Sequence, residues 1–323
     1  MTVAPVLSFI VPVRDDAVRL RRCLQSIARS RGHIPIEIVV ADNGSVDGSV
    51  EVAERAGAVV LRLPGVCVSE LRNAAAKAAS GGILAFVDAD HEIDAAWVAT
   101  AVATLRGPSV GAAGASYEAP PDGTWVQRTY DALRRRQRRA IEVDWLASGN
   151  LVVWQSVFES LHGFDTTLET CEDVDFCRRL RERGYLLIED PRLRSIHHGD
   201  PASLKALFLS ELWRGRDNVR ASLRGRLRLR ELPSIAVPIA ELGLLLAAAA
   251  GVLMFSPAGV ALSASAVAPL VALAVLRASM MSRRRQSRNP VHFLQSIPVA
   301  IVYDAARALA LVARTRHQVR RRA

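Results

Sequence analysis

The N-terminal part of the chain alternates short apolar runs with segments whose apolar residues recur every three or four positions. Apolar runs rich in β-branched residues extend over Val6–Val13, Ile36–Val40, Val59–Leu63 and Ile83–Val87. Helical spacing is found between them, at Leu20, Leu24, Ile27 and Ala28, and over Ser49–Ala56 and Ser69–Ala79. Runs of this kind are typical of strands buried on both faces, and the strand–helix–strand order favours parallel pairing. The pattern predicts an α/β domain with an open, mostly parallel sheet.

Beyond residue 95 the pattern predicts fewer elements. Trp97–Arg106 has the pattern of a helix, and Pro120–Gly123 marks a loop. Tyr130–Ile141 is predicted to form a strongly basic helix, and Glu172–Gly184 an amphipathic helix that closes at its glycine. A short strand is expected over Leu186–Ile188. No internal repeat is found.

Two apolar stretches near the C-terminus have the length of membrane spans, which is about 20 residues. Ile235–Phe255 contains Glu241 as its only charge, and Ala258–Leu276 contains none. Arginines precede the first stretch and follow the second, while the connection at Ser256–Pro257 is uncharged. The positive-inside rule therefore predicts a helical hairpin with both ends in the cytoplasm. A buried pair of helices in a soluble domain is the alternative.

A third apolar stretch, Val291–Ala313, contains Pro298, Asp304 and Arg307 and precedes a basic tail. If it crossed the membrane, that tail would lie outside, against the rule. We therefore expect an interfacial or re-entrant helix, with a third span as the alternative. Leu204–Trp213 is apolar on one side and is also expected to lie along the membrane surface.

The distribution of charge separates the two parts of the chain. The 323 residues carry 42 basic and 32 acidic side chains and are 50% hydrophobic, which excludes a disordered chain. Residues 1–200 hold 23 basic and 27 acidic residues, whereas residues 201–323 hold 19 and 5. Because the basic charge lies beside membrane-length apolar runs, it indicates arginine flanks that face lipid rather than a nucleic-acid-binding groove.

The cysteines and the N-terminus indicate the cellular compartment of the first two thirds of the chain. The four cysteines include no CxxC pair, so neither a zinc site nor a disulfide framework is predicted. The N-terminus has no basic segment before its first apolar run, so no cleaved signal peptide is expected. The first two thirds of the chain should be cytoplasmic.

Acidic residues follow the predicted strands. Asp42 ends the second run and leads into small residues, and Asp88 and Asp90 follow the fourth. In open α/β sheets, ligands bind outside the carboxyl ends of the strands. Two carboxylates two residues apart point to one side and can hold a divalent cation that neutralises a diphosphate. The alternatives are a plain turn after Asp42, in which Ser45 or Asp47 caps the next helix, and exposed loop acids at Asp88 and Asp90.

Two further segments carry polar residues with two possible roles. Arg72 lies on the predicted helix before the fourth strand, where a solvated helix face is the alternative. Glu172 and Asp173 begin a predicted helix, where acids stabilise the helix dipole in any case. One of them could otherwise serve as a general base toward an attacking hydroxyl.

Five motifs, taken in order, resemble those of the family 2 glycosyltransferases with the GT-A fold. They cover roughly residues 6–199 and are IVPVRDD (10–16), VVADNGSVDGS (39–49), RNAAAKAASGGILAFVDADHEID (72–94), SGNLVV (148–153) and GFDTTLETCEDVDFCRRLRERGY (163–185). The resemblance implies an inverting transferase that uses a nucleotide-diphosphate sugar and a divalent metal, Mg²⁺ or Mn²⁺. No nucleic-acid partner is expected, because the basic charge lies beside the membrane-length apolar stretches.

The resemblance also assigns roles to residues. Pro12, Asp16, Asp42 and Arg72 would lie around the nucleotide, and Asp88 and Asp90 would lie around the metal diphosphate. Asp173 would be the catalytic base, with Glu172 as its nearest rival. His197 resembles the late histidine of the family, which can approach the metal or the phosphates, although a structural histidine is the alternative.

Together these features predict four segments. Residues 1–200 would form the GT-A domain, 201–232 a basic interfacial segment, 233–277 the transmembrane hairpin, and 278–323 a basic C-terminal region. An arginine cluster at 134–139 could bind acidic lipid or an acceptor phosphate, or be a solvated helix face. The expected function is sugar transfer at the cytoplasmic face of the inner membrane, to a hydroxyl on a lipid-linked or polysaccharide acceptor. A catalytically silent scaffold that binds nucleotide sugar in the membrane is the alternative.

Overall fold

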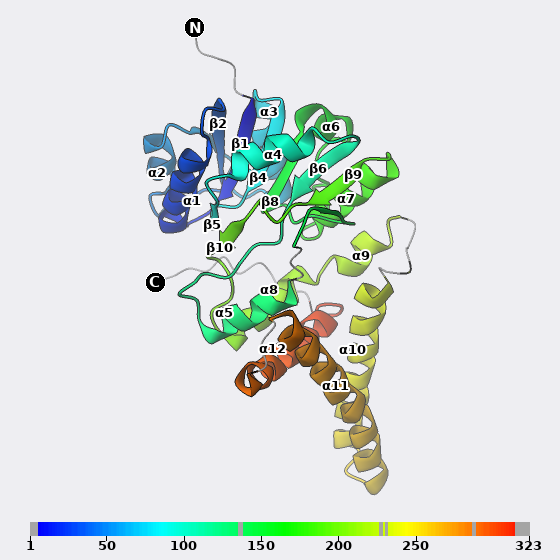
Figure 1. Cartoon of the computed structure of the whole chain (residues 1–323). Coiled ribbons are helices and arrows are strands. Elements are labelled where there is room, and N and C mark those ends of the chain that lie inside the picture. Colours follow the sequence, from blue (N-terminus) through cyan, green and yellow to red (C-terminus); the bar gives the residue numbers. More distant parts are fainter. Residues whose placement is uncertain (1–5, 135–137, 226–228, 230–231, 286–288, 314–323) are drawn as a thin grey trace. The chain divides into compact units, whose positions relative to one another are not determined.

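The computed structural model describes residues 6–134, 138–225, 229, 232–285 and 289–313. These residues form two compact units. The first comprises residues 1–120 and 136–200, and the second comprises residues 121–135 and 201–323. Figure 1 shows the sheet of the first unit and the helices of the second.

The first unit is built on an eight-stranded sheet with the order β3-β2-β1-β4-β8-β6-β9-β7. Its strands are β1 Leu7–Val13, β2 Ile36–Asp42, β3 Val59–Arg62, β4 Ile83–Val87, β6 Val110–Gly114, β7 Ile141–Glu142, β8 Asn150–Trp154 and β9 Leu186–Glu189. The strands β3, β2, β1 and β4 pair in parallel, as do β6 and β9, whereas β8 runs antiparallel to β4 and β6 and β7 antiparallel to β9. The predicted α/β class with a mostly parallel sheet is confirmed.

Helices cover both faces of this sheet. They are α1 Ala17–Ser30, α2 Ser49–Arg55, α3 Val68–Ala78, α4 Trp97–Leu105, α6 Gln155–Ser160 and α7 Glu172–Glu182. Phe9 and Val11 of β1 join one apolar core with residues of α1, α2 and α4, while the adjacent Ile10 joins a second core with α3, α6 and α7. Because side chains alternate along a strand, a strand covered on both faces must be apolar throughout, which explains the uninterrupted runs in the sequence.

A second, two-stranded sheet crosses the carboxyl end of β4. It pairs β5, His91–Ile93, with β10, Ser195–His197, in antiparallel register, so that His91 lies opposite His197. Two histidines more than 100 residues apart in the sequence are thereby brought together.

The predicted basic helix over Tyr130–Ile141 is wrong. Helix α5, Trp125–Tyr130, ends where this helix was expected to begin, and a single 3₁₀ turn, η1, follows at Asp131–Leu133. Residues 135–137 lie outside the described part of the chain, and Ile141 belongs to β7. The sequence from 134 to 139 contains five arginines and one glutamine, so it offers a helix no apolar face to bury.

The second unit is helical in its described residues. Besides α5 and η1 it contains α8 Leu204–Arg214, α9 Asn218–Ser222, α10 Leu232–Leu253, α11 Pro257–Arg284 and α12 Pro290–Leu309. Helix α12 packs against α5, α8, α10 and α11. Leu207 and Leu212, on the apolar side of α8, are buried in small cores with residues of α12.

Two of the described helices, α10 and α11, are long and apolar enough to cross a membrane. Only 11% and 17% of their most apolar windows are buried, whereas the core helix of a soluble domain is mostly buried. They are joined at a turn where a Cβ on Gly251 would come within 2.8 Å of the Ser263 nitrogen and would also overlap the Gly259 carbonyl. The two helices therefore fit membrane association as a closely packed hairpin (Figure 1).

Candidate active site

The loops that follow β1 and β2 are tied to each other by side-chain oxygens. The buried Asp42 carboxylate accepts hydrogen bonds from the backbone N–H groups of Gly44 (3.0 Å) and Ser45 (3.1 Å). The Ser45 hydroxyl accepts the N–H of Asp15, whose carboxylate accepts the N–H of Val46, both at 2.9 Å. Asp42 thus fixes the shape of its own loop, at the edge of the sheet where a ligand of an α/β fold binds.

Pro12 and Asp16 lie at the same edge. Pro12 pairs with Ala41 of β2, beyond Ile10, where the pairing of β1 with β4 ends. A residue without an N–H is tolerated there because the strand has only one neighbour. Asp16 accepts a hydrogen bond from Arg19 (2.9 Å). Burial raises the pKa of Asp16, although Arg19 opposes the shift.

Arg72 is the centre of a buried ion-pair network. Its guanidinium, on α3, donates to Asp88 at 2.7 Å and to Glu172 at 2.7 Å. Arg72 is 3% exposed, so its charge is balanced by these two carboxylates rather than by water. The structure thus brings together three of the predicted site residues, with Arg72 joining the end of β4 to the start of α7.

Asp173 lies beside this network and is less engaged. The Ser148 hydroxyl donates to Glu172 (3.1 Å), while the Ser148 N–H donates to Asp173 (3.2 Å). Burial and the neighbouring charge of Glu172 raise the pKa of Asp173 to about 7. A partly exposed carboxylate that titrates near neutral pH can accept a proton from a substrate, whereas Glu172 is buried against a permanent cation.

Two backbone positions beside these residues are strained. Asp15 and Cys171 have φ angles of 48° and 62°, in the left-handed region that residues with a Cβ rarely adopt. Cys171 directly precedes Glu172 and Asp173, and Asp15 directly precedes Asp16. Such strain persists only where surrounding contacts fix the chain, and it is frequent at functional sites.

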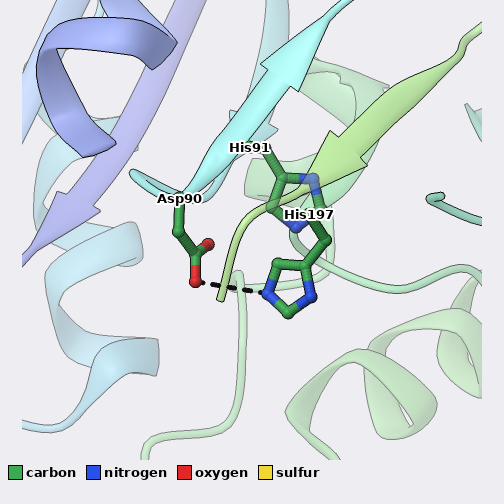
Figure 2. Close-up of side chains that lie close together, drawn as sticks. All are labelled: Asp90, His91 and His197. Atoms are coloured by element: carbon green, nitrogen blue, oxygen red, sulfur yellow. Dashed lines mark ion pairs between the residues drawn. The ribbon is translucent and has the colours of Figure 1, made fainter. Parts of the chain in front are cut away.

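Asp90, His91 and His197 form a second group of polar side chains (Figure 2). Each offers one ligand atom, and these atoms lie within 4.8 Å of one another. His197 Nε2 is 3.2 Å from Asp90, and His197 Nδ1 is 2.6 Å from Asp200. Although burial favours the neutral imidazole, the two carboxylates raise the pKa of His197 to about 10. Asp90 in turn has a lowered pKa, because His197 outweighs the effect of burial.

These residues fit a divalent cation. A carboxylate and two imidazoles are common metal ligands, and the second carboxylate, Asp200, holds His197 in orientation as an outer partner would. In the present arrangement a protonated His197 offsets one of the two negative charges of Asp90 and Asp200, and a bound divalent cation is the other way to compensate them. Arg19, 3.9 Å from Asp90, connects this group to Asp16.

Two glycines allow the acidic groups to approach the backbone. A Cβ on Gly149 would lie 2.7 Å from Asp88 Oδ2 and 3.2 Å from His91 Nε2. A Cβ on Gly199 would overlap Asp90 Oδ2 and lie 3.0 Å from His197 Nε2. A larger residue at either position would displace these side chains, and the first contact shows that Asp88 and His91 converge on one point.

Several residues of the site were not singled out in the sequence. They are Arg19, His91, Ser148, Gly149, Gly199 and Asp200. His91 directly follows Asp90, and Ser148 directly precedes Gly149, both within the motifs described above. Membership of these motifs could have identified the two residues as site candidates. Asp200 lies three residues after His197, and only the fold shows that the two side chains meet.

A family model and two similar proteins are all named as glycosyltransferases. The family model described as glycosyl transferase family 2 matches residues 8–177, which is just over half of the chain. The glycosyltransferase AglE of Haloferax volcanii is 27% identical over 243 residues, covering 72% of this chain and 79% of its own. The N-acetylglucosaminyl-diphospho-decaprenol L-rhamnosyltransferase of Mycobacterium tuberculosis is 27% identical over 283 residues, covering 70% of this chain and 91% of its own.

A solved structure has the same fold. The mannosyltransferase PcManGT from Pyrobaculum calidifontis, in complex with GDP-Man and Mn²⁺, superposes with a TM-score of 0.63 over 95% of this chain and 88% of its own. The two sequences are 19% identical, so this likeness concerns the fold.

Proposed function

The chain belongs to glycosyl transferase family 2, and we propose that this glycosyltransferase moves a sugar from a nucleotide-diphosphate donor to a hydroxyl acceptor with inversion at the anomeric carbon. The observation that carries the proposal is the network in which Arg72 joins Asp88, at the end of β4, to Glu172, while Ser148 joins Glu172 to the adjacent Asp173, a carboxylate that can act as a base. A single displacement needs one base for the incoming hydroxyl and a stabilised leaving group, and the two parts of the site supply these.

Asp173 is the proposed catalytic base. Ionised, it accepts the proton of the acceptor hydroxyl as that oxygen attacks the sugar from the side opposite the diphosphate. Ser148 holds one oxygen of the carboxylate, and Glu172 raises its basicity through its charge. Glu172 itself is assigned a positioning role, because it is buried and bound to Arg72 and to the Ser148 hydroxyl.

Asp90 and His197, with His91 and Asp88 beside them, would hold the divalent cation. When bound, such a cation neutralises the charge that develops on the departing diphosphate. Imidazole ligands favour Mn²⁺ over Mg²⁺, which prefers oxygen ligands throughout. The structural relative in complex with GDP-Man and Mn²⁺ supports a donor and a metal of this kind.

The nucleotide is proposed to bind along the loops after β1 and β2. Pro12, Asp16 and Asp42 lie at this edge, and the Asp42 loop presents its backbone in a fixed shape. Arg72 is buried and its guanidinium is engaged by Asp88 and Glu172, so we assign it to positioning rather than to nucleotide contact.

The acceptor is proposed to be lipid-linked. Two exposed apolar helices of membrane length and a relative named for a decaprenol-linked sugar support this proposal. The arginines at both ends of the hairpin favour a catalytic domain on the cytoplasmic face of the inner membrane, with residues 1–200 as that domain. Residues 201–232 would lie at the membrane interface, and residues 233–277 would form the transmembrane hairpin. Residues 278–323 would form a basic region, and its helix α12 would lie in the interface or span the membrane.

The test is donor turnover by the full chain in detergent. Hydrolysis and binding of UDP, GDP and dTDP sugars are measured with Mn²⁺, Mg²⁺ or EDTA. We expect one donor class to be turned over with Mn²⁺, and Asp90→Ala to lower the rate about 10³-fold, since a metal supplies several kcal/mol of charge stabilisation.

Asp94→Ala is the matched control, because Asp94 is an exposed acid of the same motif. It should retain the wild-type rate. Donor binding without turnover under every condition would instead favour the silent scaffold, and no metal-dependent binding of any donor would contradict the proposed function.

A further inference from the structure

Trp145 is the most exposed of the five tryptophans in the chain. Its side chain lies in the loop between β7 and β8, and the residue is 53% exposed, whereas Trp97 is fully buried and Trp125 is 38% exposed. Single exposed apolar residues are common on protein surfaces, but tryptophan offers a large flat face and an N–H donor and is enriched where a ligand or partner binds. The proposed catalytic function assigns this residue no role.

The loop that carries Trp145 is held on α7 at alternate positions. Asp144 pairs with Arg181 at 3.1 Å, and the N–H of Leu146 donates to Cys177 Sγ at 3.4 Å. Two residues further, Ser148 donates to both Glu172 and Asp173. Residues 144, 146 and 148 are thus fixed on one helix while the indole at 145 remains in solvent.

This arrangement places the backbone of an exposed tryptophan close to the residue that holds the proposed base. Ser148, which holds Asp173, is three residues from Trp145, and three residues of extended chain span at most about 10 Å. An acceptor hydroxyl must reach Asp173, so the rest of the acceptor extends past this part of the site. A fixed indole on a rigid loop can bind it at a small cost in conformational entropy.

We propose that Trp145 is the stacking platform for a pyranose ring of the acceptor. One face of a pyranose presents C–H groups that pack on a flat aromatic surface, while its hydroxyls remain at the edge, facing polar groups and water. The proposal rests on the proposed function, because it takes the attacking hydroxyl to belong to a sugar already present on the acceptor.

The experiment compares Trp145→Ala and Trp145→Phe with wild type and with Trp125→Ala, the matched control at another exposed tryptophan. Full-length protein is kept in a detergent without a sugar headgroup. The probes are the methyl pyranosides of glucose, galactose, mannose, N-acetylglucosamine and rhamnose, and binding is measured by ligand-observed saturation-transfer NMR. Donor hydrolysis with Mn²⁺ is measured on the same wild-type preparation.

We expect wild type and Trp125→Ala to bind at least one pyranoside, with saturation transferred mainly to its ring C–H protons. Trp145→Ala should weaken this binding about tenfold, a typical cost for an aromatic that anchors a ligand, and Trp145→Phe should retain most of it. Where a bound pyranoside also accepts sugar, Trp145→Ala should raise the KM for that acceptor and leave the KM for the donor unchanged.

Equal binding by wild type and Trp145→Ala, or no binding of any pyranoside by wild type, would overturn this assignment. Failure of the proposed function has a different signature, because donor hydrolysis is then absent whether or not pyranosides bind at Trp145.

Discussion

Each of the two units contains a buried glutamate that accepts hydrogen bonds from an arginine and from a side-chain hydroxyl. Glu172 accepts from Arg72 at 2.7 Å and from the Ser148 hydroxyl at 3.1 Å. Glu211, on α8, accepts from Arg214 at 3.1 Å and from the Tyr130 hydroxyl at 2.6 Å. They are 6% and 2% exposed. Viewed alone, neither network differs from an ordinary buried ion pair.

The difference lies in where each network leads. Arg72 continues to Asp88, and Glu172 acts on the pKa of the adjacent Asp173, so the first network ends at groups that can meet a substrate. The second joins helices to each other, from Tyr130 on α5 through α8 to Arg307 of α12, 3.8 Å from Glu211. A buried ion pair therefore indicates function by what it is connected to, not by its own geometry.

The sharpest test of this contrast is Asp173→Asn. The amide keeps the size of the side chain but cannot accept a proton, so we expect kcat to fall about 10³-fold, within the range for a lost general base. The melting temperature should fall only modestly, because no ion pair is removed and the amide loses one of two backbone N–H bonds, from Ser148 or Val174. A rate within tenfold of wild type would move the base to another residue, with Glu172 first in line.

Glu172→Gln should have the next largest effect. Loss of its charge leaves Arg72 paired only with Asp88, and we expect kcat to fall about 30-fold through misplacement of Asp173. It should also lower the pKa of Asp173, since the Glu172 charge raises that pKa. The acid limb of the pH profile should therefore move to lower pH, a readout that loss of stability alone would not produce.

The wild-type pH profile tests the first network without mutation. Asp173 must be ionised to act as a base, and its pKa is raised to about 7. The value of kcat/KM should therefore fall about tenfold per pH unit below pH 7 and level off above it. Measured at saturating Mn²⁺, a flat profile between pH 5 and 8 would contradict a base with this pKa.

Glu211→Gln should have the smallest effect on turnover, less than about twofold. Its network lies wholly within the helical unit, so the cost should appear as lower stability, about 1 to 3 kcal/mol for a disrupted buried charge. The melting temperature and the donor turnover of the purified chain report the two effects separately. A loss of turnover as large as that of Glu172→Gln would remove the distinction between the two networks.

The sequence predicted those parts of the fold that depend on local pattern. The first four strands and the helices between them were confirmed, because the apolar periodicity of a doubly covered sheet is a strong signal. The sequence could not identify the partners of Arg72, since Glu172 is 100 residues away along the chain and a lone arginine on a helix has many possible roles. The antiparallel strand β8 and the small β5–β10 sheet also depend on long-range pairing.

Local sequence pattern was enough to select those candidate site residues that lie next to one another in the sequence. Asp88, Asp90, Glu172 and Asp173 were chosen from their positions after a strand or at the start of a helix, and their proposed roles stay predictions. For His197 the sequence offered only a pair of adjacent histidines, and its contacts with Asp90 and Asp200 require β10 to pair with β5. The helix predicted after Tyr130 was wrong because helix propensity alone, without an apolar face to bury, does not stabilise a helix.

Gly199 shows how a residue without functional groups can restrict the variation of a site. A Cβ at this position would overlap an oxygen of the Asp90 carboxylate, so a larger residue would have to displace that carboxylate from its place beside His197, and a random library should tolerate few substitutions at position 199. A glycine next to two histidines resembles a spacer in the sequence. In a map of tolerated substitutions it would instead stand out as a restricted position, because each larger residue would move a carboxylate that the site uses.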